Sequence, residues 1–411
     1  MFELNEPQRM VEQVFRQFAE KELLPRVERL ESGEELPYDL MRRMTRDLMG
    51  GDRISKALHR QADRMETGSS ADGRSAGREK GRRGEMDDPM IFSLIAKELS
   101  RVSPGFTMSW GVSVGLCGAG ILNKGTPDQI RRYAAPVMSM ERIGAWALTE
   151  PEAGSDAFGS MKTTARPDGD DYVISGSKTF ITNAPHADVF LVYAKLDRGR
   201  PPAERPVHGF IVERTMPGLS TGRPFVKMGM KDSPTGEVFL DEVRVPKENL
   251  LGGREDRSMR DEAKESLGTE RSGMAPMCLG IVERCYELSL GYARQRRQFG
   301  RPIAEYQAIQ LKLADMYIRL QNVWNIVYRL AWMTRNDKRD MAYFCATKVY
   351  CARAAVQTAL DAIQIHGGYG YMQEYHVEKL MRDAKLLEIG AGTSDINALT
   401  TARLELGLAP S

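Results

Sequence analysis

The sequence predicts an α+β fold in which an N-terminal helical domain, a central antiparallel β-domain and a C-terminal helical bundle follow one another. Three observations support this prediction. Over residues 1–134, apolar residues recur at three- and four-residue steps, as at Ile91 and Leu94, which is typical of amphipathic helices. Over 135–252, short β-rich runs are separated by Gly, Pro and Asn. Over 253–411 the helical period returns and continues to the end.

The composition indicates an ordinary globular protein. A chain of 411 residues suffices for about two to three domains, and 42% hydrophobic with 28% charged residues allows a core and a polar surface. A formal charge of +2 argues against a nucleic-acid partner, which would favour a strong basic excess. No apolar run reaches the roughly 18 residues of a membrane span. The first residues form an amphipathic helical pattern with early acids, unlike a signal or transit peptide, so we expect a cytoplasmic protein.

One segment of the N-terminal region breaks the helical pattern. The stretch METGSSADGRSAGREKGRRGEMDDP, residues 65–89, is rich in Gly, Ser and charge, and its only apolar residues beyond Ala are two methionines. Such a segment buries too little apolar surface to offset the entropy of ordering, so we expect a mobile insertion. Its basic residues could contact an acidic partner, but a solvated insertion is the simpler interpretation.

The central region contains four runs with the composition of strands. They are DYVISGSKTFITNA (171–184), DVFLVYAKL (188–196), HGFIVE (208–213) and GEVFLDEVRVP (236–246). β-Branched and aromatic residues are frequent in these runs, and turn-forming residues lie between them. This pattern predicts an antiparallel barrel or sandwich.

A polar linker, GGREDRSMRDEAKES (252–266), precedes helices with heptad spacing. Two apolar series recur every seven positions, one from Tyr306 to Val327 and one from Ile309 to Leu330. Together they form an a/d seam of about 25 residues, which predicts long helices packed in a bundle. Stripes of apolar residues before and after this seam predict two further helices.

The cysteines and histidines do not indicate a metal or redox site. The five cysteines form no CxxC pair and no cluster with histidine, so we expect buried free thiols and no metal. His366, in IQIHGG, is expected to be a helix-end residue. No GxGxxG follows a strand and no GxxxxGK occurs, so neither a Rossmann site nor a P-loop is predicted.

Four longer stretches form a more specific pattern. They are WALTEPEAGSD (146–156), GSKTFITNA (176–184), RQFGRPIAEYQAIQ (297–310) and IQIHGGYGYMQEYHVEKLMRDAKLLEIGAGTSDI (363–396). In order and spacing they resemble the acyl-CoA dehydrogenase family, from about residue 90 to the C-terminus. The resemblance implies a C-terminal four-helix bundle, FAD between the β-domain and the bundle, and a homotetramer in which a second subunit contributes to the site. It also implies an acyl-CoA substrate and an electron-transfer flavoprotein as electron acceptor.

The resemblance also assigns cofactor contacts. A flavin needs main-chain donors and small hydroxyls at its polar edge and an apolar or aromatic cover on its faces. By resemblance, the residues that meet the flavin half are Trp146, Leu148, Thr149, Gly154, Ser155, Phe180 and Thr182. Those that hold the adenine and pyrophosphate half, partly across a subunit interface, are Arg296, Phe299, Gln364 and Gly368. Thr393 and Asp395 close the other end.

The general base needs a separate argument, because the closing stretch EIGAGTSDI (388–396) has no carboxylate before Asp395. Many family members carry the catalytic Glu two residues before the closing Thr, where this chain has Ala391. A subset that includes isovaleryl-CoA dehydrogenase carries it before an Arg at the start of the bundle, and Glu270–Arg271 matches that position. The resemblance therefore implies that Glu270 removes the α-proton of the acyl thioester. The alternative is a structural Glu in the first turn of a helix, where the macrodipole favours it.

The closing stretch also bears on the substrate. By resemblance, a flavin ribityl hydroxyl and the N–H aligned with Ala391 hydrogen-bond the thioester oxygen, and Ser155 and Arg271 belong to the substrate site. Gly390 replaces a common Tyr and Ala391 replaces the Glu, so two small residues leave space beside the β-carbon. We therefore expect a short or medium branched acyl chain.

The region near residues 50–60 departs from the family pattern. Relatives carry a Pro-Glu-Glu-Tyr-Gly-Gly-type turn there, near the acyl pocket and the docking site of the electron acceptor, whereas this chain has LMGGDRISKALHRQ. Three hypotheses therefore stand. They are FAD-dependent α,β-dehydrogenation of a branched acyl-CoA to the 2-enoyl-CoA, dehydrogenation of an acyl group bound to a carrier protein in a biosynthetic pathway, and a flavin-binding paralogue without dehydrogenase activity.

Overall fold

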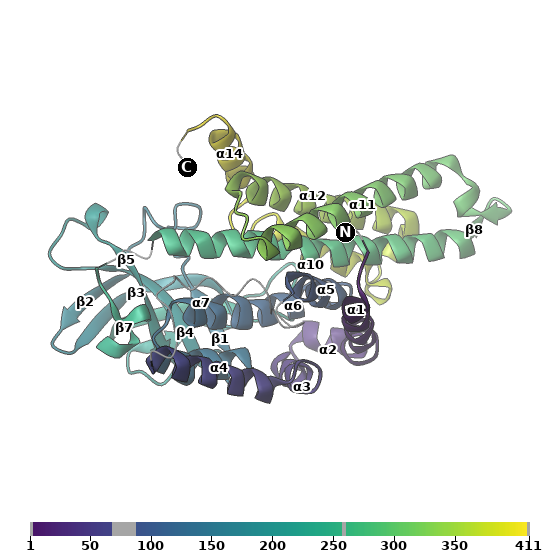
Figure 1. Cartoon of the computed structure of the whole chain (residues 1–411). Helices are drawn as coiled ribbons and strands as arrows, with labels where there is room; N and C mark the ends of the chain where they lie inside the picture. Colours follow the sequence, from purple (N-terminus) through teal and green to yellow (C-terminus); the bar gives the residue numbers. More distant parts are fainter. Residues whose placement is uncertain (1–2, 68–87, 257–259, 409–411) are drawn as a thin grey trace.

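The structure, a computed structural model, describes residues 3–67, 88–256 and 260–408, and for residues 260–270 it describes the backbone alone. Short helices, a β-sheet and a bundle of long helices follow one another along the chain (Figure 1). The predicted fold class is confirmed. The predicted mobile insertion lies almost wholly outside the described residues.

The N-terminal part consists of short helices and helical turns with clear start signals. Side chains of Asn5, Asp88 and Ser103 accept backbone N–H groups at the starts of three helices, each with Pro at its first positions. The elements are α1 (Glu6–Phe18), η1 (Ala19–Leu23), η2 (Leu24–Arg26), α2 (Val27–Ser32), α3 (Tyr38–Met49), α4 (Gly51–Glu66), α5 (Pro89–Ser100), α6 (Pro104–Gly111), η4 (Val112–Gly118), α7 (Ala119–Lys124), α8 (Pro127–Gln129), η5 (Ile130–Ala134) and α9 (Ala135–Met138).

Seven strands form the central sheet. They are β1 (Gly144–Ala147), β2 (Thr164–Asp168), β3 (Asp171–Thr182), β4 (Val189–Leu196), β5 (Val207–Glu213), β6 (Leu219–Thr221) and β7 (Thr235–Pro246). Their order is β1-β4-β2-β3-β7-β6, with β5 paired to β4. Strand β4 pairs in parallel with β1 and β2, and the other pairs are antiparallel. Every residue of β4 is buried, so this strand is the centre of the domain.

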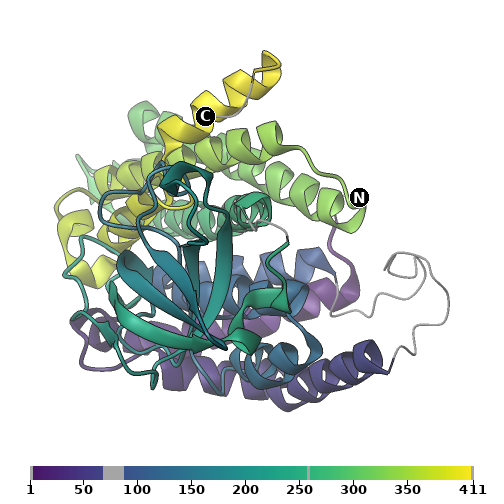
Figure 2. The same ribbon diagram turned by 90° about the vertical axis from the view of Figure 1, so that its left-hand side faces the viewer.

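Different parts of the chain pack against the two faces of the sheet. Figure 2 looks onto the sheet, with the N-terminal helices below it and the bundle above. On one face, Val189, Leu191 and Tyr193 of β4 belong to a hydrophobic cluster that also contains residues of α4, η4 and η5. The stretch Pro104–Lys124 is the one helix among the described residues that is long and apolar enough to span a membrane. However, 61% of its most apolar window is buried inside the protein, as in the core helix of a folded domain.

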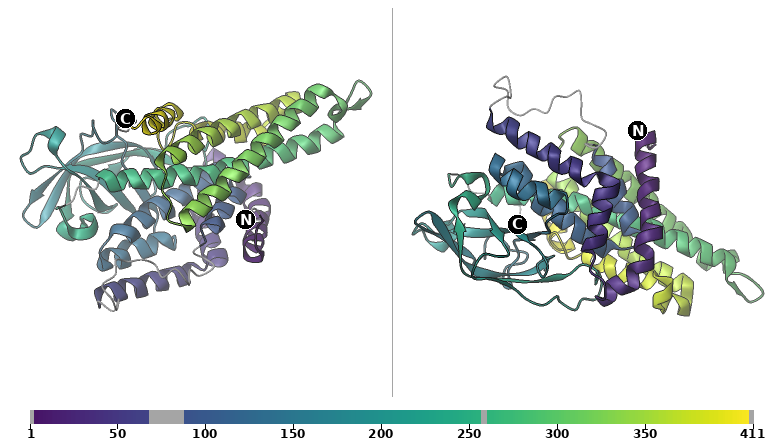
Figure 3. Two further views of the ribbon diagram at one scale, coloured as in Figure 1. Left: turned by 45° about the horizontal axis from the view of Figure 1, so that its top comes forward. Right: turned by 90° about the horizontal axis from the view of Figure 1, so that it is seen from below.

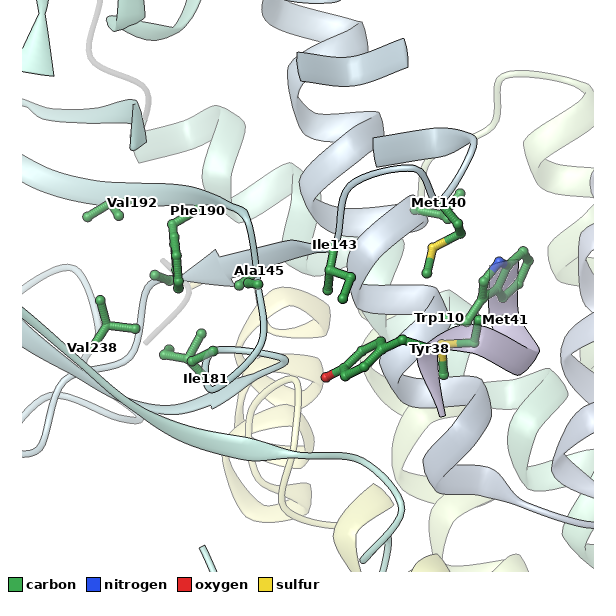
Figure 4. Packing of buried hydrophobic residues seen from close by; sticks show 14 of the residues in the cluster. Tyr38, Met41, Trp110, Met140, Ile143, Ala145, Ile181, Phe190, Val192 and Val238 are labelled. Carbon is green, nitrogen blue, oxygen red and sulfur yellow. The ribbon is translucent and has the colours of Figure 1, made fainter. Parts of the chain in front are cut away.

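The opposite face of the sheet shares a core with the first helices. Figure 4 shows Tyr38 of α3 between sheet residues such as Phe190 on one side and Trp110 of α6 on the other, all within one buried cluster. The Tyr38 hydroxyl donates to Oδ1 of Asn183 (3.1 Å), whose amide donates to the carbonyl of Gly144 (3.0 Å). These bonds satisfy buried polar groups, so helices and sheet are fixed to each other.

The C-terminal part is dominated by three long helices that lie side by side (Figure 3). Its elements are α10 (Arg260–Gln295), the hairpin β8 (Arg297–Gln298) and β9 (Arg301–Pro302), η9 (Ile303–Glu305), α11 (Gln307–Arg335), α12 (Met341–His366), η10 (Gly367–Tyr371), η11 (Gln373–Tyr375), α13 (Val377–Leu387) and α14 (Ser394–Glu405). Met316, Val323 and Leu330 of the predicted seam are buried on α11, which confirms the heptad interpretation. The predicted linker is wrong in its second half, because α10 begins at Arg260.

Candidate active site

The loop that follows β1 is anchored by a buried ion pair. Lys178 of β3 donates to Oε1 of Glu150 (2.9 Å) and to the carbonyl of Leu148 (3.0 Å). The neighbouring carbonyl, that of Thr149, accepts the N–H of Thr179 (2.9 Å). Two successive main-chain groups of the predicted flavin-edge segment are therefore held in place by β3.

Burial and the charge of the partner shift the pKa values of both residues of this pair. Burial lowers the pKa of Lys178 to about 8, although the charge of Glu150 opposes the shift. For Glu150, burial acts to raise the pKa, but the charge of Lys178 and hydrogen bonds from Thr163 and Lys162 outweigh it, and the pKa is lowered. Both groups are therefore charged at neutral pH, and each depends on the other.

An aromatic patch stands next to this loop on the surface of the sheet. The pairing of β3 with β7 shifts register between Lys178 and Ile181, and Phe180 has a φ of 57°. This bulge turns the Phe180 ring outward, where it is 69% exposed and lies 5.6 Å from the ring of Phe225. Thr182, half-buried, ends the same strand. Sequence reasoning misses Phe225, whose only signal is its place in the short apolar pair FV.

The remaining predicted residues of the β-domain lie around the same loop. Trp146 is half-buried and its ring meets the edge of Tyr193 at 5.4 Å, so its side chain is held by packing. Gly154 and Ser155 are exposed, and a side chain at Gly154 would meet nothing within 4 Å. The space next to Gly154 is therefore open.

The closing loop between α13 and α14 lies against the bundle. Ala391 and Gly392 both have positive φ, 52° and 82°, which makes a tight turn. Nε of Arg271 donates to the carbonyl of Ala391 (3.3 Å), so these two predicted substrate residues meet. The hydroxyl of Thr393 accepts the N–H of Ile396 (3.2 Å) and so caps α14.

Two further predicted residues of this loop differ in their exposure. Asp395 is exposed in the first turn of α14. Gly390 is partly buried, and a Cβ there would lie 3.4 Å from Cε of Met274, an ordinary contact, so the site has room for a methyl group.

The backbone of Glu270 lies well inside α10, which begins at Arg260. The interpretation of Glu270 as a first-turn residue is therefore wrong, and the helix macrodipole does not account for it. Its side chain lies outside what the structure describes, so its role as base stays a prediction. The contact between Arg271 and Ala391 nevertheless shows that this segment of α10 runs beside the closing loop.

The residues predicted to hold the adenine half lie at the other end of the bundle. Phe299, at the turn of the β8–β9 hairpin, is 95% exposed. The guanidinium of Arg296 lies over the ring of Tyr369 at 5.6 Å, and Gln364 and Gly368 are exposed at the end of α12 and in η10. Figure 1 shows β8 and the β-domain at opposite ends of the molecule. Within one chain, this set does not meet the flavin-edge set.

The two sets of residues fit the two halves of FAD. The β-domain offers an exposed aromatic patch and anchored main-chain groups for a flavin ring, and the far end offers a cation and an exposed aromatic ring for adenine and pyrophosphate. In the described part of the chain, no group of three or more His, Cys, Asp or Glu could hold a metal ion. All five cysteines are buried and free, as predicted.

The sequence models of three domain families match the chain. Residues 79–141 match "Acyl-CoA dehydrogenase, N-terminal domain", residues 145–243 the middle domain, and residues 261–405 the C-terminal domain.

Curated relatives agree with these matches. The chain is 34% identical over 402 residues to the "Probable acyl-CoA dehydrogenase YngJ" of Bacillus subtilis, with 98% of each chain covered. It is 40% identical over 314 residues to "Isovaleryl-CoA dehydrogenase, mitochondrial" of Oryza sativa subsp. japonica, with 76% of each covered. It is 34% identical over 403 residues to the "Caffeyl-CoA reductase-Etf complex subunit CarC" of Acetobacterium woodii, with 98% of this chain and 99% of the relative covered.

Solved structures share the fold along nearly the whole chain. The prolyl acyl carrier protein oxidase AnaB matches with a TM-score of 0.84 at 28% identity, covering 99% of this chain and 100% of the other. An acyl-CoA dehydrogenase complexed with FAD from Bacillus anthracis matches with a TM-score of 0.80 at 32% identity, covering 98% of this chain and 68% of the other.

Proposed function

The chain belongs to the acyl-CoA dehydrogenase family of FAD-dependent oxidoreductases, and we propose that it converts a short or medium branched acyl-CoA to the 2-enoyl-CoA. One observation carries the proposal. The side chain of Arg271 meets the carbonyl of Ala391 (3.3 Å), so the helix segment with Glu270 runs beside a closing loop that has no carboxylate of its own at position 391. A base on α10 would therefore act at this loop.

The residues of the chain would divide the reaction among them. When bound, FAD supplies the acceptor for the hydride that leaves the β-carbon. The carboxylate of Glu270 takes the α-proton as general base. A main-chain N–H of the closing turn donates to the thioester oxygen and stabilises the charge that forms as the proton leaves.

The small residues of the closing loop support a branched substrate. Gly390 has no side chain, and the position that its Cβ would take has only Met274 as a side-chain neighbour, at 3.4 Å. Ala391 adds only a methyl group. A branch at the acyl chain can occupy the space that a Tyr or Glu would otherwise fill.

The opposite positions of the two cofactor sets support a shared site. One FAD could contact both Phe180 and Phe299 only if the two residues came from different copies of the chain. Phe180 belongs to β3 and Phe299 to the turn of the β8–β9 hairpin, and these elements lie at opposite ends of one molecule (Figure 1). This arrangement favours the homotetramer that the family resemblance implies. The relative named as part of a caffeyl-CoA reductase-Etf complex supports an electron-transfer flavoprotein as the acceptor.

A second candidate substrate is an acyl group on a carrier protein. Its support is the match with the prolyl acyl carrier protein oxidase along 99% of this chain. The reaction at the thioester would be the same, and the group that carries the thioester would differ.

A substrate panel tests the proposal. The FAD-loaded protein is mixed without oxygen with butyryl-CoA, isovaleryl-CoA and octanoyl-CoA, and with the same acyl groups on an acyl carrier protein, while flavin absorbance is followed. We expect isovaleryl-CoA to bleach the flavin fastest. Faster bleaching by the carrier-bound thioesters would favour the second candidate, and no bleaching by any thioester would contradict both.

The base is tested by Glu270→Gln. We expect the variant to keep FAD and to bind acyl-CoA, while flavin reduction slows by about a hundred- to ten-thousand-fold, the usual loss when a positioned base is removed. Glu405→Gln, at an exposed position near the end of α14, is the matched control. A Glu270→Gln protein that reduces its flavin at the wild-type rate would refute the assignment.

The closing loop offers a rescue experiment for the same assignment. The double change Glu270→Gly with Ala391→Glu should restore part of the activity, because a carboxylate on the loop can reach the same α-carbon. It should also lower activity toward branched chains relative to straight ones, since the new side chain fills the open space.

A further inference from the structure

The closing turn is held from the bundle side by side chains of three helices. Arg271 of α10 donates to the carbonyl of Ala391 (3.3 Å). Nζ of Lys348 on α12 donates to the carbonyl of Gly392 (2.7 Å). Nδ2 of Asn397 on α14 reaches the carbonyls of both residues, at 3.4 and 2.7 Å, and the next carbonyl at 3.0 Å. Three successive carbonyls are thus fixed.

The buried amide of Asn397 is oriented by this contact. Lys348 and Asn397 are 1% and 0% exposed. Oδ1 of Asn397 has no hydrogen-bond partner among the described residues, whereas its Nδ2 faces three carbonyl oxygens. Reversing the amide would place an acceptor against three acceptors, so the donor must face the turn. The bonds to the turn offset the cost of an unpaired buried oxygen.

Peptide geometry then sets the direction of two N–H groups of the turn, those of Gly392 and Thr393. In a trans peptide, a carbonyl and the N–H of the following residue point in opposite directions. With the carbonyls of Ala391 and Gly392 held by the bundle, the N–H groups of Gly392 and Thr393 point away from it. Among the described residues, none accepts a hydrogen bond from the N–H of Ala391, Gly392 or Thr393. All three residues are partly exposed.

We propose that Asn397 and Lys348 are positioning residues, which hold the 391–393 turn so that its N–H groups meet the thioester oxygen of the substrate. The proposal rests on the function proposed above and extends it to residues that do not touch the substrate. Asn397 lies in α14 and Lys348 in α12, behind the turn, so each acts through the main chain.

Binding of two ligands that differ in one oxygen tests this role. The ligands are the thioester of the panel that reduces the flavin fastest and the S-alkyl-CoA thioether of the same chain, which lacks the carbonyl. The variants are Asn397→Leu and Lys348→Met, with Lys348→Arg as the conservative change. Asn336→Leu is the control, because Asn336 is an exposed amide that also donates to a main-chain carbonyl, that of Trp332 (2.8 Å).

We expect the wild type and Asn336→Leu to bind the thioester more tightly than the thioether. Asn397→Leu and Lys348→Met should lose about fivefold or more of that preference and roughly ten- to a hundredfold in the rate of flavin reduction. Lys348→Arg should keep most of both. A purely structural role would weaken both ligands alike.

The outcomes separate this inference from the proposed function. Variants that retain FAD and the full thioester preference would overturn the positioning role and leave the proposed function intact. Equal weakening of both ligands would also overturn it. A wild-type protein that neither binds nor oxidises any thioester of the panel would overturn the proposed function and this inference with it.

Discussion

Two lysines of this protein are equally buried, yet their pKa values move in opposite directions. Lys178 in the β-domain and Lys97 in α5 are 0% and 1% exposed. Burial lowers the pKa of Lys178 to about 8, with Glu150 as its one carboxylate partner among the described residues. Burial also acts to lower the pKa of Lys97, but three carboxylates outweigh it and the pKa is raised. The number of counter-charges, rather than depth, decides the sign.

The group around Lys97 and the Lys178–Glu150 pair are therefore expected to respond differently when one charged residue is lost. The carboxylates around Lys97 are Glu12, Glu98 and Glu283, and Arg16 and Arg101 also pair with this group. A network of this kind across α1, α5 and α10 keeps partners for each charge when one member is lost. The β-domain pair has no such reserve, and it lies beneath the loop that is expected to meet the flavin.

The largest expected effect is that of Glu150→Gln. It leaves the buried ammonium of Lys178 without a counter-charge, and breaking a buried pair in this way typically costs about 3–5 kcal/mol. Urea unfolding should show the loss, and the purified variant should contain less FAD. Glu152→Gln, which removes an exposed partner of Lys162 in the same loop, should change neither.

The double variant Lys178→Met with Glu150→Gln sharpens this test. No unpaired charge remains, so much of the stability should return. The carbonyl of Leu148 loses its donor in this variant, so the FAD content should stay low. Recovery of both properties would show that the pair stabilises the fold without shaping the cofactor loop.

A smaller effect is expected in the pH dependence of unfolding. The pKa of folded Lys178, about 8, lies below its ordinary value of 10.5. Between these values the unfolded chain binds a proton that the folded chain has released, so this residue adds stability as the pH rises. The slope is at most about 1.4 kcal/mol per pH unit. Lys178→Met should remove this rise when urea unfolding is followed from about pH 8 to 10.

Lys97→Met provides the comparison for that experiment. Because the pKa of Lys97 is raised, its stabilising charge is fully present below its ordinary value of 10.5 and is lost only above it. The difference in unfolding free energy between the wild type and Lys97→Met should therefore stay constant over the same range. A constant difference for Lys178→Met as well would mean that Lys178 keeps its proton throughout.

The smallest effect is expected for Glu12→Gln. Lys97 keeps Glu98 and Glu283, and Glu12 is partly exposed, so the loss should be about 1 kcal/mol or less. Thermal or urea unfolding measures it. A loss as large as that of Glu150→Gln would contradict the idea that the network provides reserve partners.

Local periodicity accounts for what the sequence predicts about the fold. The seven-residue series of α11 and the β-branched runs of β3 and β7 are short-range patterns, and both appear as the expected elements. The parallel pairing of β4 with β1 and β2 depends on the path of the chain in space, which no local pattern encodes. The start of α10 is missed because its first turns are polar.

In the candidate site, too, some residues could be predicted from the sequence and others could not. The residues named from the family resemblance fall in three groups, and their roles remain predictions. The flavin-edge set and the adenine set lie at opposite ends of the molecule, and the third group is the closing loop with Arg271. The side chains that support them carry no signal in the sequence. Lys348 and Asn397 are unremarkable within helices, and Phe225 lies in a loop. Their importance arises from contacts between residues far apart in the sequence, such as that between Lys348 and Gly392.

The separation of Phe180 and Phe299 has a consequence for mixed assemblies. If each FAD bridges two copies of the chain, a substitution at Phe180 and a substitution at Phe299 affect different contacts of the cofactor. Where a copy altered at Phe180 pairs with a copy altered at Phe299, one of the two shared sites collects both defects and the other receives none. Two inactive alleles could then complement each other in one cell, and neither could do so alone.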